Sequence, residues 1–236
     1  MRALIFDCDG VLVDTERDGH RVAFNQAFAA RGLEVNWGVE LYGELLAVAG
    51  GKERIRHYFD QYGWPPQIKD QDGFVKELHR LKTDLLMEII NGGRLPLRSG
   101  IARLVDEAKS EGVLLAICST SNERAVNLIV EKLLGPDRKR KFAAILAGDI
   151  VARKKPDPGI YNLVKQRLDL PAQECLVIED SRNGLLAAKS AGMHCVITIS
   201  AYTAQEDFTE ADAVFPELGD PPQVRASLAD LRRIVS

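Results

Sequence analysis

Two aspartates and a glycine directly follow the first apolar run of the chain. Asp7 and Asp9 stand one residue apart behind the strand-forming residues 4–6, and Gly10 comes next. Residues i and i+2 of an extended chain point to the same side, so both carboxylates can share one site. Two carboxylates at such a short distance favour a cation bound between them, and Mg²⁺ is a cation that prefers oxygen ligands. Because Asp and Gly are also ordinary turn residues, a simple turn after the strand explains this stretch as well.

Three further polar groups follow later apolar runs. One group supplies hydroxyls and backbone N–H groups at a helix start, which suits a phosphate, although an ordinary helix cap has the same composition. A basic pair, Lys154 and Lys155, precedes another helix start, and such a pair is often only solvated surface. Glu179 and Asp180 end a further apolar run, where they could bind a metal or cap the next helix. The first of these groups consists of Ser119, Thr120, Ser121 and Asn122.

The requirements of phosphoryl transfer account for all four groups together. A carboxylate can attack phosphorus to give an acyl phosphate, which water then hydrolyses. Because both the substrate and the aspartate pair are anionic, Mg²⁺ and a lysine are needed to reduce their repulsion. The leaving alkoxide also needs a proton from an acid within hydrogen-bond reach. We therefore expect the acids, the hydroxyl and the lysine to meet at one edge of a sheet.

The order of the expected elements favours an α/β fold with a helical insertion. Beyond residue 97, strands alternate with helices, which predicts a doubly wound, mainly parallel, Rossmann-like sheet. Residues 14–93 show only helical periodicity, so we predict a core domain of residues 1–14 and 94–236 and an all-helical cap domain of residues 15–93. The expected strands of the later half are 113–118, 143–147, 175–178, 195–199 and 213–215, and the helices are 101–111, 122–134, 158–168 and 183–191.

Composition bounds the class of protein. The 236 residues are 46% hydrophobic and 28% charged, with a net charge of -3, as in an ordinary soluble globular protein. There is no basic excess to favour nucleic acid or an anionic membrane as partner, and no apolar run approaches a membrane-spanning length. Each of the four cysteines lies in or beside an apolar run without metal-ligand spacing, so we expect buried free thiols and a reducing compartment. They are Cys8, Cys118, Cys175 and Cys195.

In order and spacing, the four polar groups resemble the four motifs of the haloacid-dehalogenase-like hydrolase superfamily. The resemblance implies Asp7 as nucleophile and Asp9 as general acid and base. It implies that Ser119 and Lys155 hold the transferring phosphoryl group, with Thr120 beside them. It also implies a Mg²⁺ site formed by Asp7, the backbone carbonyl of Asp9, Asp180 and Glu179. An acid at position 9 points to phosphoryl transfer, since the leaving halide of a dehalogenase needs no proton.

The helical insertion is similar to the cap of the CbbY group, whose members are phosphatases acting on xylulose 1,5-bisphosphate, an inhibitor of Rubisco. This resemblance implies that the cap holds a second phosphate. Two glycines would let backbone N–H groups approach that phosphate closely, and basic side chains would supply positive charge. Singly, any of these basic residues could equally belong to a solvated helix face. The expected substrate-binding residues of the cap are Glu16, Tyr42, Gly50, Gly51, Lys52, Arg54, His79 and Lys82, with Ser121 and Asn122 as weaker candidates in the core.

One departure from the group concerns His20. Relatives space a Glu and the following His as E-x-x-H, whereas Glu16 and His20 are four residues apart. One extra residue rotates a side chain by about 100° around an α-helix. We therefore leave a substrate role for His20 open.

The sequence is compatible with three functions. The first is Mg²⁺-dependent hydrolysis of a sugar bisphosphate, with xylulose 1,5-bisphosphate favoured, by a monomer without nucleic-acid or membrane partner. A phosphomutase of the β-phosphoglucomutase type needs nearly the same residues, because the outcome depends on whether the cap admits water. A non-catalytic phospho-sensing module would share the sheet but not the large cap. We expect a cytoplasmic location in a bacterium, or the plastid stroma in a photosynthetic eukaryote.

Overall fold

The computed structural model describes residues 1–235 and divides them into two compact units. The first unit contains residues 1–14 and 96–236, and the second contains residues 15–95. Arg94 and Leu95 thus group with the second unit. Within the described residues, no helix is both long enough and apolar enough to cross a bilayer.

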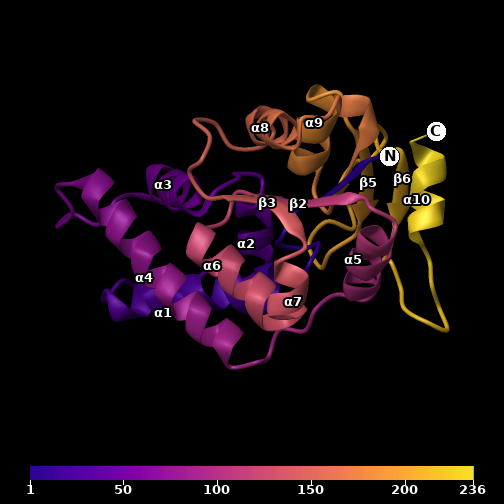
Figure 1. The fold of residues 1–236 in the computed structure, drawn as a ribbon. Coiled ribbons are helices and arrows are strands. Elements are labelled where there is room, and N and C mark those ends of the chain that lie inside the picture. Colours follow the sequence, from indigo (N-terminus) through magenta and orange to yellow (C-terminus); the bar gives the residue numbers. More distant parts are fainter. Residues whose placement is uncertain (236) are drawn as a thin grey trace. The chain divides into compact units, whose positions relative to one another are not determined.

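The first unit is built on six parallel strands (Figure 1). Their order across the sheet is β3-β2-β1-β4-β5-β6, so the chain starts in the middle, winds to one edge, and returns to fill the other. This is the doubly wound order in which ligands bind at the carboxyl ends of the strands, next to the point where the winding reverses. The predicted fold class is confirmed. The strands are β1 (Ala3–Phe6), β2 (Leu114–Ser119), β3 (Phe142–Ala147), β4 (Cys175–Glu179), β5 (His194–Thr198) and β6 (Ala213–Phe215).

Helices cover both faces of this sheet, which explains why β1 and β4 are buried along their whole length. One face packs on α8 and α9, where Ile5, Val177 and Tyr161 belong to a single buried cluster. The helices of this unit are α5 (Ile101–Ser110), α6 (Glu123–Ile129), α7 (Gly135–Lys139), α8 (Gly159–Leu168), α9 (Arg182–Ser190) and α10 (Leu228–Ile234). All four cysteines are free and buried.

The second unit is helical and has an aromatic core. Trp37 is fully buried between Phe24 and Phe28, with ring centroids 4.7 and 4.8 Å away. Its helices are α1 (Arg21–Ala30), α2 (Val39–Leu45), α3 (Gly51–Tyr62) and α4 (Gln71–Asn91), preceded by a single π-helical turn, Glu16–His20. Such aromatic pairs bury large areas, so this small unit has a core of its own.

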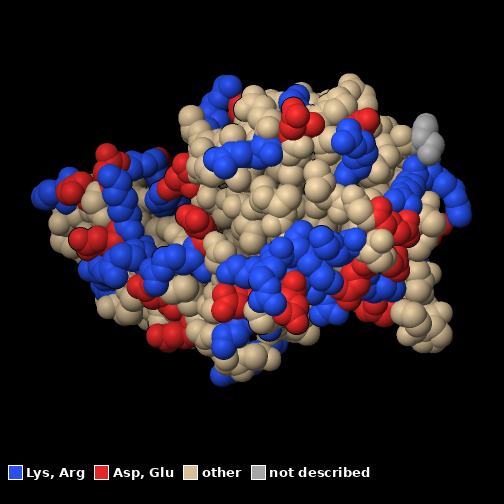
Figure 2. Space-filling view, in the orientation of Figure 1, with Lys and Arg blue, Asp and Glu red and all other residues tan. Residues whose placement is uncertain are grey.

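Most element ends lie within one or two residues of the predicted ones. The predicted helix 122–134 is an exception, because it is divided into α6 and a π-helical stretch, Val130–Leu134. Two helices, α7 and α10, were not predicted from the sequence. Ser227 and Asp230 form a capping box at the start of α10, and this pattern was the available signal. On the face shown in Figure 2, basic and acidic side chains are interspersed. Among the ion pairs of the first unit, Arg138 and Lys141 both contact Asp106.

Candidate active site

The loop after β1 is shaped by Gly10. The backbone N–H of Asp7 still donates to Ile178 of β4 at 2.9 Å, and the chain then turns through Gly10, whose φ is +78°. A Cβ at Gly10 would lie 1.9 Å from Oδ2 of Asp180. Only glycine combines this backbone conformation with so close an approach. The turn therefore brings the first strand end against the end of β4.

Lys155 joins residues from three strand ends. Its buried ammonium group lies 2.7 Å from Oδ1 of Asp7, 2.5 Å from Oε1 of Glu179 and 3.0 Å from the carbonyl oxygen of Cys118. These three contacts use all three donors of the ammonium group. The predicted meeting of the lysine with the acids is thus present in the structure.

Glu179 is held from several sides. Tyr161 of α8 donates its hydroxyl to Oε1 at 2.5 Å, and the backbone N–H of Asp180 donates to Oε2 at 3.2 Å. The Lys155 ammonium also lies 5.0 Å from the centre of the Tyr161 ring. Sequence reasoning missed Tyr161, because a tyrosine on the apolar face of a helix reads as an ordinary core residue.

Burial dominates the electrostatics of this cluster. It raises the pKa of Asp7 to about 8, an effect that Lys155 opposes and that Glu179 and Asp9 reinforce. Burial lowers the pKa of Lys155, but attraction to Asp7 and Glu179 outweighs it, so that pKa lies above its usual range. The lysine is therefore charged, and the site carries an excess of acid.

Three of these acids are close enough to share a metal ion. Asp7, Glu179 and Asp180 are buried, and one carboxylate oxygen of each lies within 4.8 Å of those of the other two. Hard oxygen ligands in this number suit Mg²⁺. The carboxylate of Asp9 is not part of this group, and Asp9 was expected to contribute only its backbone carbonyl.

Ser121, which follows the end of β2, contacts Asp9. Ser121 donates its hydroxyl to Oδ2 of Asp9, and its backbone N–H donates to Oγ of buried Ser119 at 3.0 Å. Thr120 is half-buried next to them. The side chain of Asn122 accepts from the N–H of Arg124 at 3.0 Å, so it caps α6. Ser121 is thus hydrogen-bonded to Asp9, the expected general acid and base.

In the helical unit, three predicted residues form a chain of hydrogen bonds. Arg54 donates to the Tyr42 hydroxyl at 3.0 Å, and Tyr42 donates to Oε2 of Glu16 at 2.5 Å. Two further donors of Arg54 bond the carbonyls of Leu45 and Val48 at 3.1 and 3.2 Å. Arg54 therefore fixes the α2–α3 connection, while it also orients Tyr42.

The start of α3 combines the two predicted glycines with basic side chains. Gly50 has φ +93° and precedes the first turn of the helix, which contains Gly51 and Lys52. A Cβ at Gly51 would lie 2.7 Å from Nε2 of His79, so the imidazole packs directly on this backbone. Backbone N–H groups at a helix start attract anions, and neighbouring basic groups strengthen this attraction.

His20 lies against Lys82 in spite of its shifted spacing. Nδ1 of His20 is 2.6 Å from Nζ of Lys82, and both side chains are buried. The turn from Glu16 to His20 is π-helical, with the His20 N–H bonded to the Thr15 carbonyl at 2.7 Å. This wider turn takes up the extra residue, so the rotation calculated for an α-helix does not apply.

Comparison with known proteins agrees with this geometry. Residues 1–192 match the haloacid dehalogenase-like hydrolase family. A CbbY-like protein of Arabidopsis thaliana is 55% identical over 231 residues, which are 96% of this chain and 72% of the relative.

Two solved structures are similar along nearly the whole chain. CbbY from Rhodobacter sphaeroides in complex with phosphate has a TM-score of 0.89 and 39% identity, covering 98% of this chain and 99% of that one. A CbbY variant from the same organism, in complex with xylulose-(1,5)bisphosphate, has the same TM-score and coverage at 38% identity. The chain therefore belongs to the haloacid dehalogenase-like hydrolase family, and it is a phosphatase enzyme with CbbY-like sequence and fold.

Proposed function

We propose that this protein is a Mg²⁺-dependent phosphatase that removes one phosphate from a sugar bisphosphate, with xylulose 1,5-bisphosphate as its substrate. The observation that carries the substrate is the similarity to the CbbY structure in complex with that compound, at 38% identity over 98% of this chain. The buried contact of Asp7 with Lys155 supports the chemistry.

In the proposed reaction, an oxygen of Asp7 attacks the phosphorus of the substrate. A P–O bond to Asp7 forms while the bond to the sugar oxygen breaks, and Asp9 gives that oxygen its proton. Water then attacks the aspartyl phosphate, Asp9 takes up the water's proton, and phosphate leaves. Ser121, bonded to Asp9, would orient this acid, and Lys155 would balance charge on the transferring group together with Ser119.

A divalent cation fits the donor set of the core unit. Asp7, Asp180 and the backbone carbonyl of Asp9 would hold Mg²⁺, which supplies positive charge beside the phosphoryl oxygens. Glu179 has both oxygens in hydrogen bonds to other groups. We therefore assign Glu179 mainly to holding Lys155, at the edge of the metal site.

The helical unit would recognise the remainder of the substrate. Glu16 and Tyr42 provide hydrogen-bonding groups for sugar hydroxyls, in an arrangement fixed by Arg54. The start of α3 would hold the second phosphate with its backbone N–H groups, assisted by Lys52 and His79. Lys82, kept in place by His20, is a further cation for this end of the substrate.

The test is a phosphate-release screen over sugar monophosphates and bisphosphates, with Mg²⁺ and with EDTA. We expect kcat/KM for xylulose 1,5-bisphosphate to exceed that for each monophosphate by at least about 10²-fold, since a second bound phosphate contributes several charge-assisted hydrogen bonds. Equal rates for monophosphates would contradict the substrate assignment.

A matched variant tests the nucleophile. Asp7→Asn keeps the size of the side chain but removes the attacking carboxylate, so turnover should be lost while the protein remains folded by circular dichroism. Full activity of this variant would exclude the aspartyl phosphate. An isomerised sugar phosphate formed without free phosphate would instead identify a mutase, the alternative that needs nearly the same residues.

A further inference from the structure

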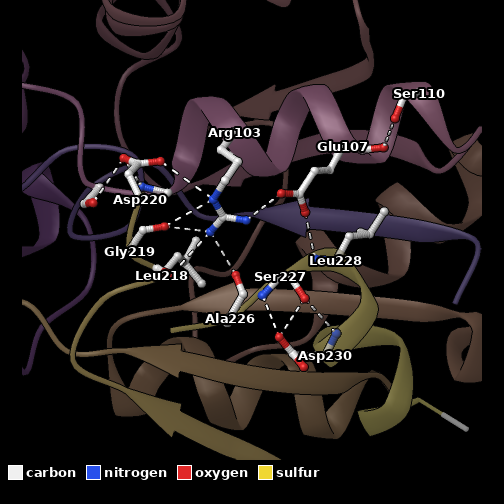
Figure 3. A network of polar contacts seen from close by, with 12 residues as sticks. Arg103, Glu107, Ser110, Leu218, Gly219, Asp220, Ala226, Ser227, Leu228 and Asp230 are labelled. Carbon is white, nitrogen blue, oxygen red and sulfur yellow. Dashed lines mark hydrogen bonds and ion pairs between the residues drawn. The ribbon is translucent and has the colours of Figure 1, made fainter. Parts of the chain in front are cut away.

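The segment after β6 lies outside the family match, which ends at residue 192. We call residues 216–230 the C-terminal segment. Arg103 of α5 holds it: the guanidinium donates to the carbonyls of Gly219 and Ala226 at 2.7 and 2.9 Å, and to that of Leu218 at 3.3 Å (Figure 3). The same guanidinium pairs with Glu107, which accepts from the N–H of Leu228.

The C-terminal segment in turn fixes the start of α5. Asp220 accepts from the backbone N–H of Gly100 at 2.8 Å and from the hydroxyl of Ser99 at 3.1 Å. Gly100 has no side chain with which to cap the helix itself, and a Cβ there would lie 2.5 Å from Cβ of Leu218. The residues just before α5 are thus set by a partner about 120 residues later in the chain.

Arg98 lies two residues before this cap and connects it to the catalytic loop. Its guanidinium donates to the carbonyl of Gly10, next to Asp9, and to those of Ile199 and Pro216 at 2.6 and 3.1 Å. Its backbone N–H also donates to the carbonyl of Leu12 at 2.8 Å. One side chain therefore joins the catalytic loop, the end of β5 and the start of the C-terminal segment.

We propose that the C-terminal segment acts through Arg98 to position the catalytic loop, which makes Arg98 a positioning residue for the reaction. This inference rests on the proposed function in one respect, namely that residues 7–10 form the catalytic loop. The bond to the Gly10 carbonyl holds the peptide plane between Gly10 and Val11, and this plane directly follows the one that contains the Asp9 carbonyl, the expected metal ligand. Polar partners behind a metal ligand typically contribute about 10- to 100-fold to metal affinity or activity.

Three substitutions separate the roles. Arg98→Ala removes the connection, Arg98→Lys keeps a cation with fewer directed donors, and Arg103→Met loosens the C-terminal segment without touching the loop. Arg2→Met is the matched control, because Arg2 forms an ion pair with Glu174 on the surface. If Arg98→Ala does not fold, the other two substitutions still decide the question.

The first measurement needs no substrate. Hydrogen–deuterium exchange of the peptide covering residues 8–13 should accelerate at least about 10-fold in Arg98→Ala and also rise in Arg103→Met, with β4 unchanged. Arg98→Lys should lie in between, and Arg2→Met should match the parent protein. If Arg103→Met accelerates exchange only in residues 216–230, the C-terminal segment is not coupled to the loop and the proposal fails.

The second measurement is steady-state phosphate release from xylulose 1,5-bisphosphate. Loss of loop position should lower kcat about 10- to 100-fold in Arg98→Ala with little change in KM, and Arg98→Lys should recover part of it. An unchanged kcat in Arg98→Ala overturns the inference. A parent protein without activity on any sugar phosphate would refute the proposed function instead, while the exchange result would still decide whether the segment holds the loop.

Discussion

Gly184 offers a sharp test of how Glu179 is held. It lies in the first turn of α9, where alanine is normally the better residue by up to about 1 kcal/mol. A Cβ at this position, however, would lie 2.0 Å from Cδ of Glu179 and 2.1 Å from its Oε2. The carboxylate of Glu179 must therefore move away in Gly184→Ala, leaving Lys155 and Tyr161 without it.

The size of the effect follows from those contacts. Breaking a buried ion pair from one side costs about 3–5 kcal/mol. Subtracting the gain in helix preference leaves a net destabilisation of about 2–4 kcal/mol. The lower part of this range is expected, because Lys155 keeps its contact with Asp7 at 2.7 Å. Phosphatase activity should also fall, because the Lys155 ammonium loses its hydrogen bond to Glu179 and is held less firmly.

The assay is urea unfolding of a double-mutant cycle with Glu179→Ala, in EDTA. In the Glu179→Ala background the three atoms nearest to the new methyl group are absent, so Gly184→Ala should there be neutral or stabilising by up to about 1 kcal/mol. The sign of the substitution should thus reverse between backgrounds. Equal destabilisation in both would show that the glycine is required by the backbone and not by Glu179, and the reasoning would be wrong.

Two further outcomes can be measured directly. Burial raises the pKa of Asp7 from 3.8 to about 8 in the folded state, so the folded protein binds this proton more tightly than the unfolded chain does. The stabilising effect of the bound proton is therefore complete below about pH 4 and is lost as the pH rises through 8. In EDTA the free energy of unfolding of the parent protein, minus that of Asp7→Asn, should fall across this window; equal pH slopes would contradict the shift. In the helical unit, a charged Lys82 must donate to Nδ1 of His20, so ¹⁵N NMR should find the Nε2–H tautomer in the parent protein, and a Nδ1–H tautomer would refute the pairing.

The core site could be predicted because parallel strands end at one edge. Asp7, Lys155 and Asp180 each follow an apolar run, and a doubly wound sheet leaves such positions little choice of location. Tyr161 could not be predicted as a partner of Glu179, since its helical spacing is the same whether its hydroxyl is bonded or not. Local patterns are unable to identify contacts that only the packed sheet creates.

The parts that escaped prediction share a long sequence separation or a rare geometry. Nothing near Asp220 in the sequence shows that it caps α5, about 120 residues earlier. Likewise, a π-helical turn from Glu16 to His20 cannot be read from the ordinary helical period, because its rotation per residue differs from that of an α-helix. In both cases the free energy comes from tertiary packing, which local preference does not encode.

The charge of the core site links its stability to its chemistry. Asp7, Glu179 and Asp180 are buried within reach of one ion, Asp9 adds a fourth acid, and Lys155 forms ion pairs with Asp7 and Glu179. Without a cation, the folded site therefore disfavours ionisation of Asp7, and the raised pKa of Asp7 reflects this cost in free energy. A divalent cation would displace the proton and restore Asp7 as a nucleophile in the same event, because both compete for one negative group. The arrangement that makes the ion-free site hold a proton at neutral pH is thus the one that would couple cation binding to activation of the attacking carboxylate.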